Sequence, residues 1–261
     1  MAAVIYEKRD HIAYITLNRP EVLNSLNKEM WEGLMQAFID MRDDPNVWVG
    51  IITGAGRAFC AGQDIGEIKQ WMEKAEKEGR PVEIELPDIT VMRGFEFWKP
   101  LIAAINGICT GGGLELALTC DIRIASEDAR LGLAEVNIGV MPTMTGTQRL
   151  TRLVPFGIAL EMLLTGDFID AKRAYEVGLV NKVVPKDKLM EEAEAFAKKL
   201  CTKAPLAMRY IKEAAYRGMN MSFAEAVWWE KYVGKAVIGT KDAQEGIKAF
   251  LEKRKPEFKG E

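Results

Sequence analysis

The chain has 261 residues, of which 48% are hydrophobic and 28% are charged, so it can bury a large core in one domain or in one domain with an appendage. A formal net charge of −3, with Lys and Arg scattered along the chain, disfavours a nucleic-acid-binding surface. No apolar run is long enough to cross a bilayer, and the first ten residues resemble neither a signal nor a transit peptide, so we expect a mature cytoplasmic protein.

The cysteines and the single histidine restrict the chemistry that the chain can perform. The four cysteines form no CxxC pair and have no zinc-ligand spacing, so we expect reduced thiols that pack as small apolar side chains. His11 falls in the first strand pattern, where an ordinary strand residue near a turn is the simplest interpretation. Ser-His and Cys-His mechanisms are therefore disfavoured, and acid–base chemistry falls to carboxylates.

Strand and helix patterns alternate in the first part of the chain. Residues 3–8 and 12–17 predict a hairpin, and residues 47–53 predict a buried strand. Between them, residues 28–41 have apolar side chains at helical spacing, with Asn27 as the expected N-cap. This order predicts an α/β fold with a parallel or mixed sheet and crossover connections.

The remaining elements divide the chain into two regions. A charged amphipathic helix is expected before residue 80, and residues 80–93, with two prolines and no firm period, predict a mobile segment or a lid. From about residue 147 the patterns are mostly helical, apart from a strand over residues 179–185. We therefore expect an α/β core over residues 1–187 and a helical region over residues 188–261.

A glycine triplet, Gly111 to Gly113, precedes the apolar helical pattern "LELAL". The first N–H groups of a helix have no intrahelical partner, and glycines let another molecule approach them closely. Such amides can stabilise an oxyanion. Tight packing of a strand on a helix explains the glycines equally well; a phosphate cradle is a weaker alternative because the GxGxxG and GxxxxGK[ST] patterns are absent.

Two acids lie in apolar surroundings. Glu115 lies in the first turn of the predicted helix, and Glu135 lies in "LGLAEVNIGVMP". Such a pair can have separated pKa values, which suits acid–base catalysis. Each acid also has a simpler explanation, since Glu115 can complement the helix dipole and Glu135 can be an exposed loop carboxylate. A further strand end, "RAFCAGQDI", is a second candidate for bare amide donors or an ordinary strand–helix turn.

Several motifs occur in order along the chain: "LNRPEVLNSLN", "IITGAGRAFCAGQDIGE", "AAINGICTGGGLELALTCDIRIAS", "LGLAEVNIGVMPTMTGTQRL", "AYEVGLVNKVVP" and "EGIKAFLEKRKPEF". Together they resemble the crotonase (enoyl-CoA hydratase/isomerase) superfamily over essentially the whole chain. The resemblance implies a repeated ββα spiral core and C-terminal helices that build trimers, often paired into hexamers. It also implies an acyl-CoA thioester as substrate, a role in acyl-CoA metabolism such as fatty-acid β-oxidation, and no cofactor apart from the CoA of the substrate.

The resemblance assigns roles to individual residues. The amides of Ala61 and Gly112 would hold the thioester oxygen as an enolate forms. Glu115 would deprotonate the water that adds at Cβ, and Glu135 would exchange the proton at Cα. The substrate channel would include residues whose positions match the family's binding motifs: Gly62, Gln63, Asp64, Ile65, Gly111 and Thr143.

The chain departs from the family pattern beside Glu135. "PTMTGTQRL" replaces the usual "PGxGGTQRL", so Thr143 and Thr145 stand where glycines are common, with Met144 between them. The side chains around "KQWM", "VMRGFEFW" and "VMPTM" are candidates for lining a modified acyl pocket or for ordinary packing. A cyclic, dienoyl or otherwise functionalised acyl group is one interpretation of these changes.

The leading hypothesis is an enoyl-CoA hydratase, because both acid positions match the hydratase pattern. The alternative within the fold is an enoyl-CoA isomerase, or a hydrolase or hydratase acting on a cyclic or dienoyl-CoA. A non-catalytic RNA-binding or scaffold relative is disfavoured by the two acids and by a pI near 5.6. A nicotinamide dehydrogenase is disfavoured by the missing dinucleotide fingerprint.

Overall fold

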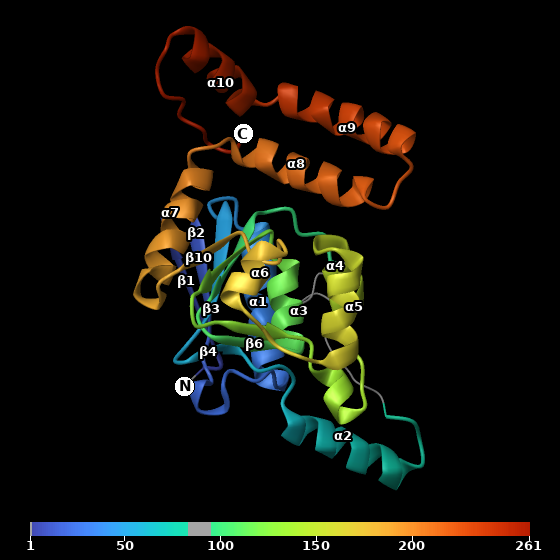
Figure 1. Ribbon diagram of the computed structural model, residues 1–261. Helices are drawn as coiled ribbons and strands as arrows, with labels where there is room; N and C mark the ends of the chain where they lie inside the picture. The colour runs from blue at the N-terminus through green and yellow to red at the C-terminus, as the bar shows by residue number, and fades with distance from the viewer. Residues whose placement is uncertain (1, 83–94) are drawn as a thin grey trace.

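The computed structural model describes residues 2–82 and 95–261, which form two sheets surrounded by helices (Figure 1). The six-stranded sheet has the order β1-β2-β3-β5-β7-β10, comprising Val4–Arg9, Ile12–Leu17, Val49–Gly54, Leu101–Ile105, Ile122–Ser126 and Lys182–Val184. The four-stranded sheet has the order β4-β6-β8-β9, comprising Ala58–Cys60, Ile108–Thr110, Arg130–Gly132 and Ile169–Asp170.

The strand directions confirm the expected mixed sheet. β1 and β2 form the predicted antiparallel hairpin, with Val4 opposite Leu17. The other neighbours in the large sheet are parallel, as are β4 with β6 and β6 with β8. Since parallel neighbours need crossover connections, the chain leaves and re-enters each sheet repeatedly.

The chain repeats one unit three times. A strand of the large sheet is followed by a strand of the small sheet and then by a helical segment: β3, β4 and α2 (Ile65–Glu78); β5, β6 and α3 (Gly112–Thr119); and β7, β8 and the 3₁₀ helix η3 (Glu135–Ile138). This is the spiral ββα core that the resemblance implies, and the prediction is confirmed.

Both faces of the large sheet are buried. Side chains alternate along β2, so that Ile15 and Leu17 join one hydrophobic cluster while Ile12 and Tyr14 join the other. Helix α1 (Lys28–Asp43) packs in the first cluster through its predicted apolar face, and Asn27 caps it by accepting a hydrogen bond from the amide of Met30 at 2.9 Å. Among the described residues before α7, the structure also has the helices α4 (Gly146–Leu153), α5 (Phe156–Thr165) and α6 (Ala171–Glu176) and the short 3₁₀ helices η1 (Pro20–Val22) and η4 (Lys186–Lys188).

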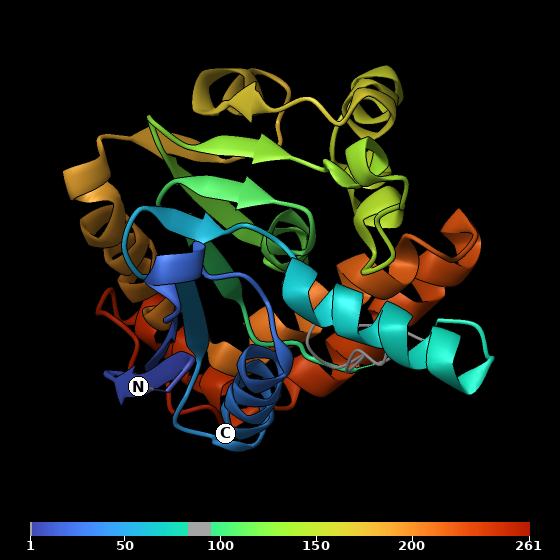
Figure 2. The same ribbon diagram turned by 90° about the horizontal axis from the view of Figure 1, so that it is seen from below.

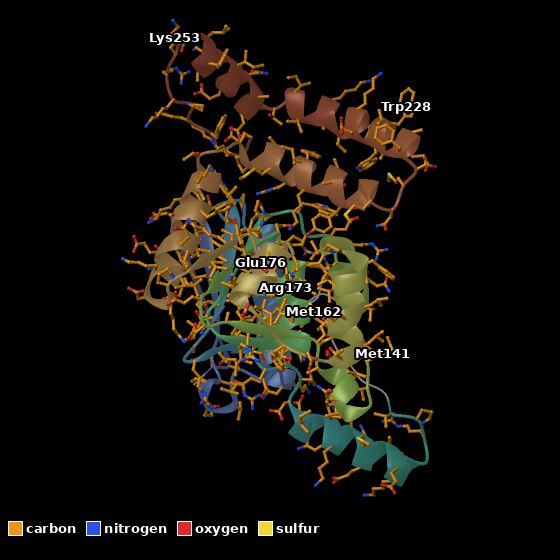
Figure 3. All side chains as sticks on the ribbon, viewed as in Figure 1. Met141, Met162, Arg173, Glu176, Trp228 and Lys253 are labelled. Atoms are coloured by element: carbon orange, nitrogen blue, oxygen red, sulfur yellow. The ribbon has the colours of Figure 1, made fainter. Side chains whose placement is uncertain are left out.

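Helix α7 (Leu189–Cys201) belongs to the core, which corrects the expected boundary at residue 188. Its Leu189, Ala193 and Ala197 are buried in the second cluster against the large sheet. The projecting helices follow it: α8 (Pro205–Gly218), α9 (Phe223–Ile238) and α10 (Lys241–Leu251). Figure 3 shows Trp228 of α9 on the side away from the sheets.

Three expectations concern single segments. In the described part of the chain, no helix is both long and apolar enough to span a membrane. The predicted packing of thiols in the core is confirmed for Cys60, Cys109 and Cys120, and burial raises the pKa of Cys60 to about 12. The predicted mobile segment over residues 80–93 lies, from residue 83 onward, outside the described residues.

Asn24 fastens the connection before α1 to the small sheet. It is fully buried; its amide group donates to the carbonyls of Ala55 and Ala58 at 2.9 Å each, and its Oδ1 accepts from the amide of Arg19 at 2.8 Å. Asn24→Ala would remove the side-chain partners of the Ala55 carbonyl and the Arg19 amide, whereas the carbonyl of Ala58 keeps a bond from Asn106 at 3.1 Å, so we expect the free energy of unfolding to fall by about 2 kcal/mol. Urea denaturation measures the loss. The matched control is Asn18→Ala, because the side-chain amide of Asn18 donates only an exposed hydrogen bond, to the carbonyl of Ala2.

Candidate active site

Three segments of the chain meet at one edge of the small sheet. β4, β6 and β8 are parallel neighbours, so the residues that follow them emerge side by side. They enclose a cavity of about 490 Å³ together with α2 and the segment between η3 and α4, which lie beside each other in Figure 2. The lining residues are Ala61, Gly62, Gln63, Ile65, Ile68, Trp71, Thr110, Gly111, Gly112, Glu115, Ala134, Glu135, Ile138, Val140, Met141, Thr143 and Met144.

Each glycine of the triplet is required for a different reason. Gly111 has φ of +54°, which a residue with a side chain rarely adopts. A Cβ on Gly112 would lie 2.3 Å from the Cε of Met144, inside the cavity wall. A Cβ on Gly113 would lie 2.3 Å from the backbone oxygen of Cys60, so that glycine serves the packing of α3 on β4.

Two backbone amides are available at the cavity. The N–H of Gly112 is the first of α3 and has no intrahelical acceptor, and the amide nitrogen of Gln63 lies 3.7 Å from the position of a Cβ on Gly112. Within residues 2–82 and 95–261, neither N–H donates a hydrogen bond to a protein acceptor. The two donors are therefore close together and open to a ligand.

The predicted donor Ala61 needs correction. Ala61 lines the cavity, but its N–H donates to the carbonyl of Leu23 at 3.0 Å, so it is already engaged. Leu26 forms a parallel bridge with Gln63: its amide donates to Gly62 at 2.8 Å and its carbonyl accepts from Asp64 at 2.9 Å. This pairing leaves the N–H of Gln63 on the cavity side.

The side chain of Gln63 is held from two sides. Its Oε1 accepts from the indole N–H of the buried Trp31 at 3.0 Å, and its amide nitrogen donates to Glu67 at 3.2 Å. These bonds restrain the backbone of the same residue. No local sequence pattern predicts this arrangement, because Trp31 belongs to α1 and contacts Gln63 only in the folded chain.

Glu115 is buried in the first turn of α3, with 1% of its surface exposed. Its Oε1 accepts from the amide of Gly146 at 2.7 Å, at the first residue of α4. Thr145, just before it, has φ of +79°, and its hydroxyl accepts from the Nε of Arg149 at 2.9 Å. A left-handed residue with a side chain carries strain, and here it turns the amide of Gly146 toward the carboxylate.

Glu135 lines the same cavity as Glu115. It begins η3, and its Oε1 is 3.5 Å from the position of a Cβ on Gly111. Its Oε2 is buried and finds no partner among the described residues. Burial raises the pKa of Glu135 above its usual range, although a hydrogen bond to its own backbone lowers it in part.

Most of the predicted site residues reach the cavity. Gly62, Ile65, Gly111 and Thr143 line it, and so do Trp71, Met141 and Met144 from the apolar stretches. The predicted binding residue Asp64 does not. Its carboxylate instead accepts from the amide of Gly66 and the guanidinium of Arg19, both at 3.0 Å, and so caps α2.

A few lining residues were not predicted. Ile68 follows Ile65 by three positions and precedes Trp71 by three, a helical spacing that could have revealed this face of α2. Ile138 and Thr110 carry no comparable signal. His11 is stacked on Trp48 at 4.0 Å between ring centroids and takes no part in the cavity, as its sequence position suggested.

Known proteins resemble the chain over nearly its full length. The enoyl-CoA hydratase/isomerase family model matches residues 7–261. The (E)-benzylidenesuccinyl-CoA hydratase of Thauera aromatica is 40% identical over 98% of this chain and 99% of its own length, and the short-chain-enoyl-CoA hydratase of Clostridium acetobutylicum is 41% identical over 97% and 96%. The crystal structure of an enoyl-CoA hydratase from Bacillus anthracis superimposes with a TM-score of 0.92 at 39% identity, covering 99% of this chain and 100% of the other. The cavity, its two carboxylates and these matches agree: the chain belongs to the enoyl-CoA hydratase/isomerase family, within the crotonase superfamily.

Proposed function

We propose that the protein adds water across the 2,3 double bond of an enoyl-CoA thioester. The observation that carries this proposal is the grouping of two carboxylates and two unengaged amides around one cavity. A hydratase must take a proton from water and deliver a proton to carbon, so two carboxylates suit it. The substrate's own CoA is the only group besides water that this reaction requires.

The amides of Gln63 and Gly112 would stabilise the reaction's charged intermediate. As water attacks Cβ, negative charge moves onto the thioester oxygen, and two oriented N–H groups placed there lower the barrier. Both amides come from rigid elements, the bridge to Leu26 and the start of α3. They need no rearrangement when the charge develops.

The two glutamates would complete the addition. Glu115 accepts a proton from water as the water oxygen bonds to Cβ, and Glu135 donates a proton to Cα as the enolate collapses. After the step Glu115 is protonated and Glu135 is ionised, so a proton must pass from one to the other, through solvent, before the next turnover. In the dehydration direction the roles reverse.

The kcat/KM of hydration and the kcat/KM of dehydration should depend on pH in the same way. Hydration consumes no net proton, and both directions need one proton shared by the two glutamates. We expect a bell-shaped profile of kcat/KM, which falls at low pH when both acids are protonated and at high pH when both are ionised. Because burial raises the pKa of Glu135, the upper limb should lie above the usual carboxyl range. Initial rates with crotonyl-CoA across a range of pH check this, and a kcat/KM that does not fall on the alkaline side would contradict the need for a protonated glutamate.

The direct test of hydration uses several enoyl-CoA thioesters. We expect the absorbance of the conjugated thioester of crotonyl-CoA to disappear while mass spectrometry detects the addition of one water. The result against a hydratase is no hydration of any enoyl-CoA together with a shifted double bond or a released acid, which would favour the isomerase or hydrolase alternative.

We also propose that helices α8 to α10 form the interface of a homo-oligomer, a trimer or a dimer of trimers. Large apolar side chains on these helices are exposed, among them Phe223, Trp228, Tyr232 and Phe250, all at 69% or more. A monomer rarely leaves such side chains in water over so many turns. Light scattering should give three or six times the mass of the chain, and a monomeric mass would contradict the proposal.

The reduced core thiols suit the cytoplasm.

A further inference from the structure

We infer that Thr145 and Arg149 form a positioning pair for Glu115, and that the hydrogen bond between their side chains is needed for full hydration activity. This inference rests on the proposed hydratase function. It gives a role to a threonine that stands where the family pattern commonly has glycine. Both residues line a separate cavity of about 370 Å³, bordered by α3, α4 and α8, so the pair would act on Glu115 through the backbone and not by touching the substrate.

Thr145 is an unusual first residue for a helix. An N-cap threonine ordinarily has an extended backbone and accepts a hydrogen bond from an amide of its own helix. Thr145 instead has φ of +79° and ψ of 2°, and its side chain makes no such capping bond. Its hydroxyl accepts from the Nε of Arg149 at 2.9 Å, and its carbonyl accepts from the amide of Arg149 at 2.8 Å. Arg149 therefore holds both the side chain and the backbone of Thr145.

The backbone of Thr145 decides where the N–H of Gly146 points. Because a peptide unit is planar, the ψ angle of one residue orients the amide of the next. At ψ of 2° the N–H of Gly146 donates to the Oε1 of Glu115 at 2.7 Å, where α3 and α4 lie side by side (Figure 1). An extended backbone, which β-branched residues favour, would turn this amide away. The bond to Glu115 thus depends on whatever stabilises the left-handed conformation of Thr145.

Glu115 is packed directly against this turn. Only 1% of its surface is exposed, and a Cβ on Gly146 would lie 2.8 Å from its Oε1. In the proposed reaction this carboxylate must be within hydrogen-bonding reach of the attacking water, and a displacement of about 1 Å can reduce the rate about 100-fold. Loss of the turn should therefore slow the chemical step more than it weakens substrate binding.

Thr145→Val tests the hydroxyl, because it replaces that group with a methyl of similar size. We expect kcat for crotonyl-CoA hydration to fall at least about 10-fold, with KM within about 3-fold of the wild-type value. Thr145→Ser keeps the hydroxyl and should stay within about 3-fold of the wild-type kcat. Wild-type kcat in the valine variant, or a serine variant as slow as the valine variant, would overturn the inference.

Arg149→Met in two backgrounds tests whether Arg149 acts through the turn. Arg149 also interacts electrostatically with Tyr216, so its removal changes more than one contact. Glycine adopts a left-handed backbone without a side-chain bond to hold it, so Thr145→Gly removes the need for Arg149. We expect Arg149→Met to lower kcat at least about 5-fold more in the wild-type background than in the Thr145→Gly background. Equal losses would show that Arg149 does not act through Thr145.

Crystal structures of Thr145→Val and Thr145→Ser test the geometry without turnover. In the valine variant we expect the amide nitrogen of Gly146 to lie more than about 3.5 Å from the Oε1 of Glu115, whereas the serine variant should keep the bond at 2.7 Å. An unchanged bond in the valine variant would overturn the inference whether or not the protein hydrates an enoyl-CoA. If the geometry changes as expected but the wild-type protein does not hydrate crotonyl-CoA, the proposed function alone is contradicted.

Discussion

Glu135→Gln is expected to lower kcat/KM for crotonyl-CoA hydration by about 10²–10⁴-fold, because glutamine cannot deliver a proton to Cα. The same change should raise the melting temperature. Burial raises the pKa of Glu135, so the native state is destabilised as pH rises through that value and this carboxyl ionises. At a pH above it, a neutral glutamine removes the cost of burying the charge.

If Glu135→Gln loses activity while its melting temperature rises, the loss comes from the catalytic step and not from unfolding. Stopped-flow assays and thermal melts on the same preparation measure both, with Glu127→Gln on an exposed loop as the matched control. Glu115→Gln should lose activity to a similar degree, while its Oε1 keeps the bond from the amide of Gly146. Near-normal turnover in either variant would show that the corresponding carboxylate does not transfer the proton assigned to it.

Gly112→Ala is expected to reduce kcat/KM by about 10²-fold with little loss of stability. The new Cβ would lie 2.3 Å from the Cε of Met144, the flexible end of a side chain, which can move. The methyl group and the displaced thioether would then occupy the space beside the amide where the thioester oxygen should bind. Loss of one oxyanion donor typically has an effect of this size.

Gly113→Ala is the contrasting variant. Its Cβ would lie 2.3 Å from the backbone oxygen of Cys60, which cannot move without shifting β4, so we expect a severe loss of folded protein. Gly112→Ala/Met144→Ala removes the clash but keeps the methyl group. If this double variant is as active as the Met144→Ala single variant, the methyl group introduced at position 112 does not block the amide. Thermal melts measure the folding of every variant.

Elements with local signals were predictable from the sequence. The hairpin of β1 and β2 forms as predicted, and Asn27 caps α1 from the position just before its first residue. The helix of residues 189–201 was also predicted, but its partner was not. Its apolar face meets the large sheet in the second hydrophobic cluster, a contact that depends on tertiary packing.

The active site could be predicted only in part. Glu115 and Glu135 stood out as acids in apolar surroundings, but their meeting depends on β6 and β8 being parallel neighbours, which no local pattern encodes. The family resemblance supplied that link.

The error at Ala61 has a similar cause. Which amide of "CAGQD" faces the cavity depends on the bridge between Leu26 and Gln63, formed by segments far apart in the chain. Ala61 and Gln63 are two residues apart, so local strand alternation does not distinguish their amides; the amide of Ala61 is taken by the carbonyl of Leu23, another segment far along the chain.

A crystal structure of the Glu135→Gln variant with crotonyl-CoA bound would test the shared site most directly. We predict a thioester oxygen about 2.7–3.1 Å from the amide nitrogens of both Gln63 and Gly112, with the side chains at positions 115 and 135 beside the neighbouring carbons. An oxygen bound elsewhere, or a double bond out of reach of either side chain, would contradict the mechanism.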